Sequence, residues 1–515
     1  MTAITNAAHT MIDSHLTAGR GGKAAFIDQA ETLTYAGLAG RCNQMANLIE
    51  TYNIPREARI GLLLLDTVDY PVTFWGAIKA GRVPVALNTL LTADTYAYML
   101  RDSRAQMLVV SAALLPVVQP ILGQLPYLKY VFVAGGDAPA FALNFRTELD
   151  AQAADYAVAD TSPDETAFWL YSSGSTGAPK GTRHVHSSLI ATAKLFGHGV
   201  LGITENDVCF SAAKIFFAYG LGNTMSFPLS VGATAILLPD RPTPASVFRM
   251  LQQHNPTLFF GVPTLYAAML VHPGAGPAIG SNRLRLCVSA GEALPEEVGK
   301  NWREKFGVDI IDGIGSTEML HIYVSNRPGD VAYGTSGRPV PGYQVRLVGE
   351  TGNDVPDGEV GELLVSGPSA ADGYWNQREK SRTTFEGHWT RSGDKYVRDA
   401  NERYVYQGRT DDMFKVSGIW VSPFEVESAL ASHADVLEAA VVPAEDTDGL
   451  LKPKAFVVLK SGGAGDAALA LALQDHVKAK AGMWKYPRWI EFTDALPKTA
   501  TGKIQRFKLR ASGKV

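Results

Sequence analysis

The chain has 515 residues, of which 46% are hydrophobic and 19% charged, a length that exceeds one hydrophobic core and predicts a large body with at least one smaller unit. Its 47 basic and 51 acidic side chains give a formal net charge of -4, which excludes the basic surface typical of nucleic-acid binding. Its three cysteines are widely spaced, which excludes a disulfide framework or a zinc spacing and fits a reducing cytoplasm.

The first third of the chain alternates apolar strands with helices. Residues 1–22 show no basic leader and no apolar run, so we expect no signal peptide. Strands are expected at 59–65, 83–86, 107–110 and 130–133, with a helix at 70–79. The longest apolar stretch, 107–122, contains two prolines and is too short to span a bilayer, so we expect no membrane contact. This alternation predicts an α/β fold whose strands are buried on both faces.

A loop rich in glycine and hydroxyl side chains, YSSGSTGAPKG at 171–181, follows an apolar segment at 167–171 that we predict to be a buried strand. Glycine lets the backbone approach an anion closely, while hydroxyl groups and a lysine bind phosphate oxygens. The alternatives are a flexible Gly/Ser turn and a Walker A loop, but in a Walker A loop the lysine follows the last glycine, whereas Lys180 precedes Gly181. The candidate phosphate-binding residues are Ser172, Ser173, Gly174, Ser175, Thr176 and Lys180.

The same alternation resumes after this loop, with strands expected at 233–238, 257–262, 285–289 and 308–311 and a helix at 244–253. Beyond residue 334, short strands between glycines and prolines predict a more antiparallel, barrel-like section. A boundary is expected at QGRTDD, 407–412. A compact α/β unit should follow, with helices at 423–432 and 468–481 and strands at 437–442, 454–459 and 489–492.

Five further motifs follow the loop in a fixed order: SAGEAL (289–294), DGIGSTE (312–318), WTRSGD (389–394), GRTDDMFKVSG (408–418) and PKTATGKIQR (497–506). Each motif taken alone could instead be a common structural feature without a binding role, such as a strand-to-helix turn, a helix start, a tight turn or a basic tail. Together they resemble the adenylate-forming family of acyl-CoA synthetases, luciferases and peptide-synthetase adenylation domains. The resemblance runs over most of the chain, to Arg506.

This resemblance implies an enzyme that uses ATP, Mg²⁺ and CoA. It implies that Glu318 binds magnesium, that Asp394 binds the ribose hydroxyls, and that Lys503 is the catalytic lysine that stabilises the adenylation transition state. The other implied nucleotide-binding residues are Ala290, Gly291, Glu292, Asp312, Thr317 and Arg409. Two departures are serines in place of threonine, in SSGSTG and in SGD, and both keep the hydroxyl group.

The resemblance also implies a division into domains. A large N-terminal adenylation body would cover 1–408, a hinge 409–412, and a small mobile C-terminal domain 413–515. Asp411 matches the family's hinge position, and Lys503 would lie on the small domain. Lys415 and Gly418 match a loop that changes sides during the cycle and faces CoA.

The acid is indicated by KIFFAYGLGN (214–223) and GIGSTEMLHI (313–322), which closely resemble benzoate-CoA ligases. That resemblance places an aromatic ring among Ala218, Tyr219, Gly315, His321 and Ile322. Small residues at 218 and 315 would leave a flat slot, and His321 would offer a polar edge. A well-packed core is the alternative, because aromatic clusters are usually core.

We therefore expect an AMP-forming aromatic acid-CoA ligase, of use in aromatic compound degradation, that converts benzoate or a substituted benzoate to its CoA thioester. The alternatives are a free-standing enzyme that loads an aromatic acid onto a carrier protein, and a non-catalytic sensor of an aromatic acid or nucleotide. The expected partners are small molecules, without nucleic acid or membrane. The sequence leaves the oligomeric state open, with a homodimer among the options, and the expected location is the cytoplasm.

Overall fold

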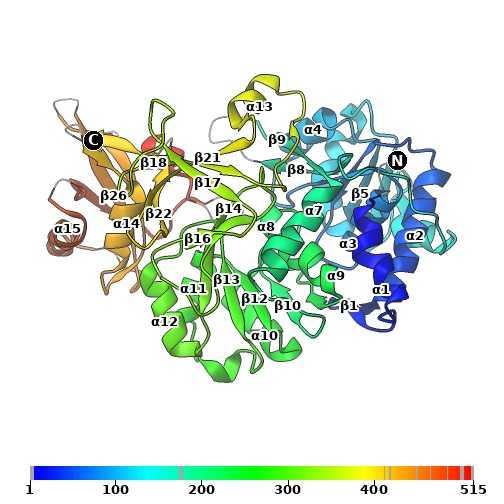
Figure 1. The fold of residues 1–515 in the computed structure, drawn as a ribbon, viewed down its shortest axis with the longest axis horizontal. Coiled ribbons are helices and arrows are strands. Elements are labelled where there is room, and N and C mark those ends of the chain that lie inside the picture. The colour runs from blue at the N-terminus through cyan, green and yellow to red at the C-terminus, as the bar shows by residue number, and fades with distance from the viewer. Residues whose placement is uncertain are drawn as a thin grey trace.

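The structure, a computed structural model, describes residues 5–172, 178–410, 412–416, 419–447, 450–463, 465–483, 485–498 and 504–511. Figure 1 shows the N-terminal helices at one end of the molecule and the C-terminal unit at the other, with the main sheets between them. The expected mixed α/β fold, with a large body and a small C-terminal unit, is confirmed.

One eight-stranded sheet contains the strand before the predicted phosphate loop. Its order is β19-β9-β8-β4-β3-β5-β6-β7. The strands from β8 to β7 run parallel, whereas β9 is antiparallel to both β8 and β19. Its strands are β3 (Arg59–Leu63), β4 (Val83–Ala86), β5 (Met107–Ser111), β6 (Tyr130–Ala134), β7 (Leu143–Asn144), β8 (Thr166–Ser172), β9 (Lys180–Val185) and β19 (Gly373–Tyr374).

A second, nine-stranded sheet has the order β16-β15-β14-β13-β12-β10-β11-β1-β2. Its five central strands, from β14 to β11, run parallel, as does β1 beside β11, so an N-terminal strand completes a sheet built mainly after residue 207. The strands are β1 (Ala24–Ile27), β2 (Thr32–Thr34), β10 (Val208–Ser211), β11 (Thr234–Ile236), β12 (Leu258–Gly261), β13 (Leu286–Ser289), β14 (Ile310–Gly315), β15 (Ile322–Ser325) and β16 (Arg338–Pro339).

Helices cover these sheets, and some of them, such as α10, begin at a side-chain cap. The Thr243 side chain accepts a hydrogen bond from Ser246 N, and Pro244 occupies the first position of α10. The main helices are α2 (Tyr35–Thr51), α3 (Asp69–Lys79), α4 (Ala93–Asp102), α6 (Phe145–Asp150), α7 (His186–Thr192), α8 (Ala218–Leu221), α9 (Phe227–Val231), α10 (Pro244–His254), α11 (Pro263–Leu270), α12 (Glu296–Phe306) and α13 (Arg378–Thr384). Shorter turns are α1 (Ser14–Thr17), α5 (Leu115–Val118), π-helices at His9–Asp13, Ala193–His198 and Gly222–Ser226, and 3₁₀ turns at Ala112–Leu114, Gln119–Gln124 and Pro277–Ile279.

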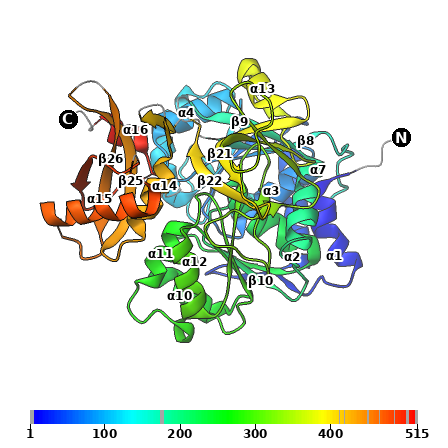
Figure 2. The same ribbon diagram turned by 60° about the vertical axis from the view of Figure 1, so that its left-hand side comes forward.

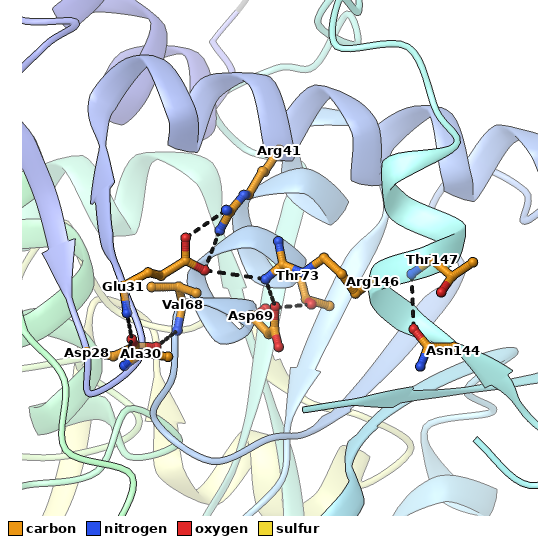
Figure 3. A network of polar contacts seen from close by, with 10 residues as sticks. All are labelled: Asp28, Ala30, Glu31, Arg41, Val68, Asp69, Thr73, Asn144, Arg146 and Thr147. Atoms are coloured by element: carbon orange, nitrogen blue, oxygen red, sulfur yellow. Dashed lines mark hydrogen bonds and ion pairs between the residues drawn. The ribbon is translucent and has the colours of Figure 1, made fainter. Parts of the chain in front are cut away.

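A polar network ties three of the N-terminal helices to the turn after β1 (Figure 3). Arg41 on α2 makes two hydrogen bonds to Glu31, of 2.8 and 2.7 Å. Arg146 on α6 donates to Asp69, at the start of α3, over 2.9 Å and reaches Glu31 over 3.5 Å. One carboxylate thus links two arginines, which fixes how α2, α3 and α6 pack together.

A five-stranded antiparallel sheet follows the two larger ones, where the barrel-like section was expected. It consists of β17 (Gln344–Val348), β18 (Gly361–Ser366), β20 (Phe385–Glu386), β21 (Trp389–Arg398) and β22 (Tyr404–Arg409). Strand β22 ends at the predicted boundary.

The C-terminal unit has its own core, which includes Val426, Leu430, Val441, Val457 and Leu473. In Figures 1 and 2 this unit stands at one side of the body. It comprises β23 (Phe414–Val416), β24 (Ile419–Val421), α14 (Pro423–Ala431), β25 (Val436–Glu445), β26 (Leu451–Leu459), α15 (Ala467–Ala481), β27 (Trp489–Phe492) and α16 (Arg506–Ala511). Across the described part of the whole chain, no helix has the length and apolarity needed to cross a bilayer.

Candidate active site

The predicted phosphate loop connects two antiparallel strands. Ser172 at the end of β8 pairs with Lys180 at the start of β9, so the loop between them is closed at its base by the β8–β9 ladder. A lysine that begins a strand, rather than a helix, separates this loop from a Walker A loop. Ser173, Gly174, Ser175 and Thr176 lie outside the described residues.

Lys180 lies beside the proposed magnesium residue. Its ammonium donates to the hydroxyl of Tyr374 over 3.2 Å, and that hydroxyl donates to Glu318 Oε1 over 2.7 Å. Burial lowers the pKa of Lys180, whereas the negative charge of Glu318 raises it. A lysine and a carboxylate joined through one phenol suit a site that binds both phosphate and a cation.

Glu318 lies in the turn between β14 and β15, and the backbone of this turn is held from two directions. Ala371 N donates to the Glu318 carbonyl over 2.8 Å. His184 on β9 is fully buried, and its Nε2 hydrogen-bonds the Thr317 carbonyl over 2.8 Å. This contact requires Nε2 to carry the proton, and burial lowers the pKa of His184 to about 4. The Thr317–Glu318 pair is thus fixed against the strand that begins with Lys180.

The proposed adenine-binding turn follows β13. Ala290 is buried, and Gly291 has φ +95°, a backbone conformation that L side chains rarely adopt. Beside it, Ser289 on β13 pairs with Asp312 on β14. Burial raises the pKa of Asp312 to about 8, and no described residue donates a hydrogen bond to its Oδ1. Ala290, Gly291 and Glu292 therefore follow the carboxyl end of β13, and Asp312 lies beside that end on the parallel strand β14. α/β proteins commonly bind nucleotides at the carboxyl ends of parallel strands.

The proposed ribose residue is paired across two strands. Asp394 on β21 lies opposite Arg409 on β22, and Arg409 Nη1 donates to Asp394 Oδ1 over 3.0 Å. Gly393 has φ +70°, and a Cβ there would lie 2.9 Å from Arg409 Nη2. The positive φ of Gly393, inside strand β21, favours the glycine of the SGD motif, and a side chain there would displace the end of Arg409.

The five residues of the predicted ring slot come from the β14–β15 hairpin and from helix α8. Gly315 on β14 pairs with Ile322 on β15, while Ala218 and Tyr219 begin α8. The ring of Tyr219 lies 5.5 Å from that of His321. Its hydroxyl donates to the Val288 carbonyl over 2.9 Å, so the phenol is anchored on β13 and its ring is available as a wall.

His321 is buried and neutral in this slot. Its Nε2 faces two acceptors, the Tyr219 carbonyl at 3.3 Å and Asn223 Oδ1 at 3.1 Å, so Nε2 carries the proton. Among the described residues nothing donates to its Nδ1. Burial lowers the pKa of His321 to about 3. The ring therefore offers an uncharged acceptor within an aromatic environment.

Comparisons with known proteins agree with this geometry. Residues 14–375 match the model of the AMP-binding enzyme family, and residues 425–503 match the AMP-binding enzyme C-terminal domain. The chain belongs to the AMP-binding enzyme family.

Its relatives in this family include ligases named for aromatic acids. The chain is 57% identical to a benzoate–CoA ligase of Thauera aromatica over 98% of this chain and 96% of that ligase. It is 56% identical to a 4-hydroxybenzoate–CoA/benzoate–CoA ligase of Rhodopseudomonas palustris over 98% and 94% of the two chains. A solved benzoate CoA ligase from Burkholderia xenovorans LB400 has a TM-score of 0.91 and 52% identity, over 98% of this chain and 99% of that chain. This AMP-binding enzyme is accordingly an AMP-forming aromatic acid-CoA ligase that uses ATP, Mg²⁺ and CoA.

Several predicted residues of this AMP-binding enzyme lie outside the described part of the chain. They are Lys503, Asp411 and Gly418, together with the four loop residues named above, and the side chain of Lys415 on β23. Tyr374, in contrast, was not predicted and contacts both Lys180 and Glu318. In the sequence this tyrosine is marked only by the glycine before it, and a Gly-Tyr pair is too common to identify a site residue.

The described residues fit the magnesium ion that this family uses. Glu318 supplies a carboxylate oxygen, the kind of ligand that Mg²⁺ prefers, beside a lysine suited to phosphate. No cluster of three or more potential metal ligands occurs among the residues described here. Mg²⁺ is commonly held by one or two carboxylates together with substrate phosphates and water, and Glu318 would be one of those carboxylates.

Proposed function

We propose that the chain converts benzoate or a substituted benzoate to its CoA thioester through an acyl-adenylate, releasing AMP and pyrophosphate. The observation that carries the proposal is the hairpin of β14 and β15. Its paired strands contain Gly315 and Ile322 of the ring slot, and its turn contains Thr317 and Glu318 of the phosphate and magnesium site. An acid in the slot would therefore lie beside the phosphates, as adenylation requires.

The proposed reaction has two steps. A carboxylate oxygen of the acid attacks the α-phosphorus of ATP, the bond to pyrophosphate breaks, and the acyl-adenylate forms. The CoA thiol, on losing its proton, then attacks the acyl carbonyl, and the bond to AMP breaks. Bound Mg²⁺ would neutralise phosphate charge, with Glu318 holding it, and the Lys503 ammonium would stabilise the charge that builds on the reacting oxygens.

The ring slot supports an aromatic acid over a long fatty chain. Two of its five proposed residues, Ala218 and Gly315, have small side chains, and the rings of Tyr219 and His321 lie 5.5 Å apart beside them. Ring substituents are weakly discriminated in an apolar pocket, by about 1–3 kcal/mol for one methylene or hydroxyl. We therefore include hydroxy- and aminobenzoates in the proposed range.

The test is ATP-dependent release of AMP across a panel of substituted benzoates, with hexanoate as the control and with CoA present or absent. We expect benzoate to be turned over at least tenfold faster than hexanoate, and only with free CoA. Turnover that requires a carrier protein would favour the loading enzyme, and binding of acid and ATP without turnover would favour a sensor. Equal rates with hexanoate would contradict the aromatic slot.

Three further features complete the proposal. The division into a body over 1–408, a hinge over 409–412 and a C-terminal domain over 413–515 follows the end of β22 and the separate core of the C-terminal unit. We place the enzyme in the cytoplasm, in keeping with three buried, unpaired cysteines. A homodimer is the assembly that we would test first, by light scattering.

A further inference from the structure

Tyr374 stands between two residues of the proposed nucleotide and magnesium site. The Lys180 ammonium donates to its hydroxyl over 3.2 Å and lies 4.3 Å from its ring centroid, while the hydroxyl donates to Glu318 Oε1 over 2.7 Å. We propose that Tyr374 is a positioning residue, whose hydroxyl holds Glu318 and Lys180 in the orientation that binds ATP together with Mg²⁺. The proposal deepens the proposed function and rests on it.

The backbone around Tyr374 is fixed from both sides. Tyr374 pairs with Thr182, two residues beyond Lys180, through the β19–β9 ladder. Its amide donates to Ser381 Oγ over 3.0 Å, and the next amide, of Trp375, donates to the Gly181 carbonyl over 2.8 Å. Only 4% of Tyr374 is exposed. The hydroxyl is therefore held in place by the same strand that positions Lys180.

The chemistry of the contact favours positioning over simple packing. A carboxylate that accepts a hydrogen bond through one oxygen, as Glu318 does through Oε1, is restricted in its rotation. A phenol fixes the carboxylate without adding charge to a site that already contains Lys180. Groups of this kind behind a metal ligand typically change metal affinity by about 10- to 100-fold.

Tyr374→Phe tests the proposal because it removes one oxygen and keeps the ring, with its packing against Phe385 at 5.4 Å between centroids. The measurement is ATP binding by calorimetry, without acid or CoA, over a series of Mg²⁺ concentrations. We expect the Mg²⁺ concentration for half-maximal ATP binding to rise about tenfold. ATP binding without Mg²⁺ should change by less than about threefold, since the ammonium of Lys180 remains.

A matched control is Tyr52→Phe, which removes a hydroxyl that donates to Glu148 Oε2 over 2.9 Å, between α2 and α6 and outside the site. We expect it to leave the Mg²⁺ dependence unchanged. If Tyr374→Phe behaves like this control, the proposal is overturned. The same holds if it weakens ATP binding equally with and without Mg²⁺, because that result would assign the hydroxyl a role apart from Glu318.

A double variant separates positioning from general damage. If Tyr374 acts through Glu318, then Tyr374→Phe should add less than about twofold to the effect of Glu318→Gln. Full additivity of the two effects would overturn the proposal even if each variant is less stable. These binding measurements contain no aromatic acid, so their results do not depend on whether benzoate is the substrate. Thioester formation by the unmodified enzyme tests the substrate separately.

Discussion

The carboxylate of Asp394 is buried and already oriented by Arg409, so in our account it binds the ribose hydroxyls without rearranging. Asp394→Asn should therefore raise the KM for ATP by about 10- to 100-fold, the cost of losing hydrogen bonds to a charged group. The KM for benzoate should change little. Steady-state kinetics with each substrate varied would measure both.

Asp330→Asn is the matched control, because Asp330 also pairs with two arginines, Arg338 and Arg403, but on the surface. Because this pair is exposed to solvent, Asp330→Asn should change the stability little, and its KM for ATP should be that of the unmodified enzyme. An unchanged KM for ATP in Asp394→Asn would remove Asp394 from the ribose site.

Three buried histidines make the stability of the protein depend on pH. Burial lowers the pKa values of His184, His186 and His321 to about 4, 4 and 3, whereas in the unfolded chain histidine titrates near 6.5. Between these values the unfolded chain binds more protons than the folded one. The free energy of unfolding should therefore fall as the pH drops below about 6.5, by about 1.4 kcal/mol per pH unit for each histidine.

Thermal unfolding between pH 7 and pH 5 tests this, with His184→Gln as the variant and His9→Gln, at an exposed position, as the control. The fall in Tm should be smaller in His184→Gln and unchanged in His9→Gln. Equal falls in all three proteins would show that His184 is not held neutral in the folded state.

Motifs in the sequence single out Glu318, Asp394 and Lys180 as candidate site residues, and the structure brings Lys180 and Glu318 into contact with the same tyrosine. Tyr374 could not be predicted, because it reaches the site from a strand 194 positions after Lys180. Its role depends on the β19–β9 pairing, and nothing in the local sequence fixes that pairing.

At the scale of elements, the β14–β15 hairpin constrains how the ring slot can be tested. A Cβ on Gly315 would lie 2.6 Å from the His321 carbonyl oxygen and 2.8 Å from Ile322 N, both backbone atoms of the neighbouring turn and strand. Gly315→Ala should therefore lower the Tm as well as the activity, since β15 must move. A loss of activity in Gly315→Ala would therefore not by itself show that the aromatic ring binds beside residue 315.

Ala218→Val is the sharper test of the slot. It should lower kcat/KM for benzoate at least tenfold by filling space, with the KM for ATP unchanged within about twofold. Steady-state kinetics and a Tm measurement on the same preparation would separate this from misfolding. Full benzoate activity in Ala218→Val would mean that the ring binds elsewhere.

Most strands and helices could be predicted from apolar periodicity, and β4 and β27 match the expected residues at both ends. The sheet to which each strand belongs could not be predicted, because strands of both main sheets have the same apolar pattern. Pairing of β1 with β11 joins residues more than 200 positions apart. The antiparallel pairing of β8 with β9 was also not predicted, because the sequence of a loop between two strands does not show in which direction the second strand runs.

At the scale of the whole molecule, the two steps make conflicting demands. Lys503 must reach the α-phosphate in the first step, and the CoA thiol must reach the same adenylate in the second. We expect the C-terminal unit to rotate about Asp411, which lies outside the described residues and just beyond β22. Such a rotation needs a residue whose φ and ψ angles can change widely.

Asp411→Pro should prevent this rotation, because proline fixes φ near about -65°. We expect the variant to keep pyrophosphate release in the first step and to lose at least about 90% of thioester formation. Asp412 provides a control position in the same proposed hinge, since its carboxylate pairs with Arg506 of the C-terminal unit over 3.4 Å and asparagine leaves the backbone angles free. Asp412→Asn should retain both steps, and undiminished thioester synthesis by Asp411→Pro would contradict rotation about this residue.

The most direct test of the account is a single time course of the unmodified enzyme with benzoate, ATP and Mg²⁺, to which CoA is added after the first phase. Before CoA, we predict benzoate-dependent release of pyrophosphate that stops near one equivalent per enzyme molecule, because the adenylate stays bound. After CoA, benzoyl-CoA and AMP should appear in equal amounts. Release of ADP and phosphate, or thioester formation without AMP, would contradict the acyl-adenylate route.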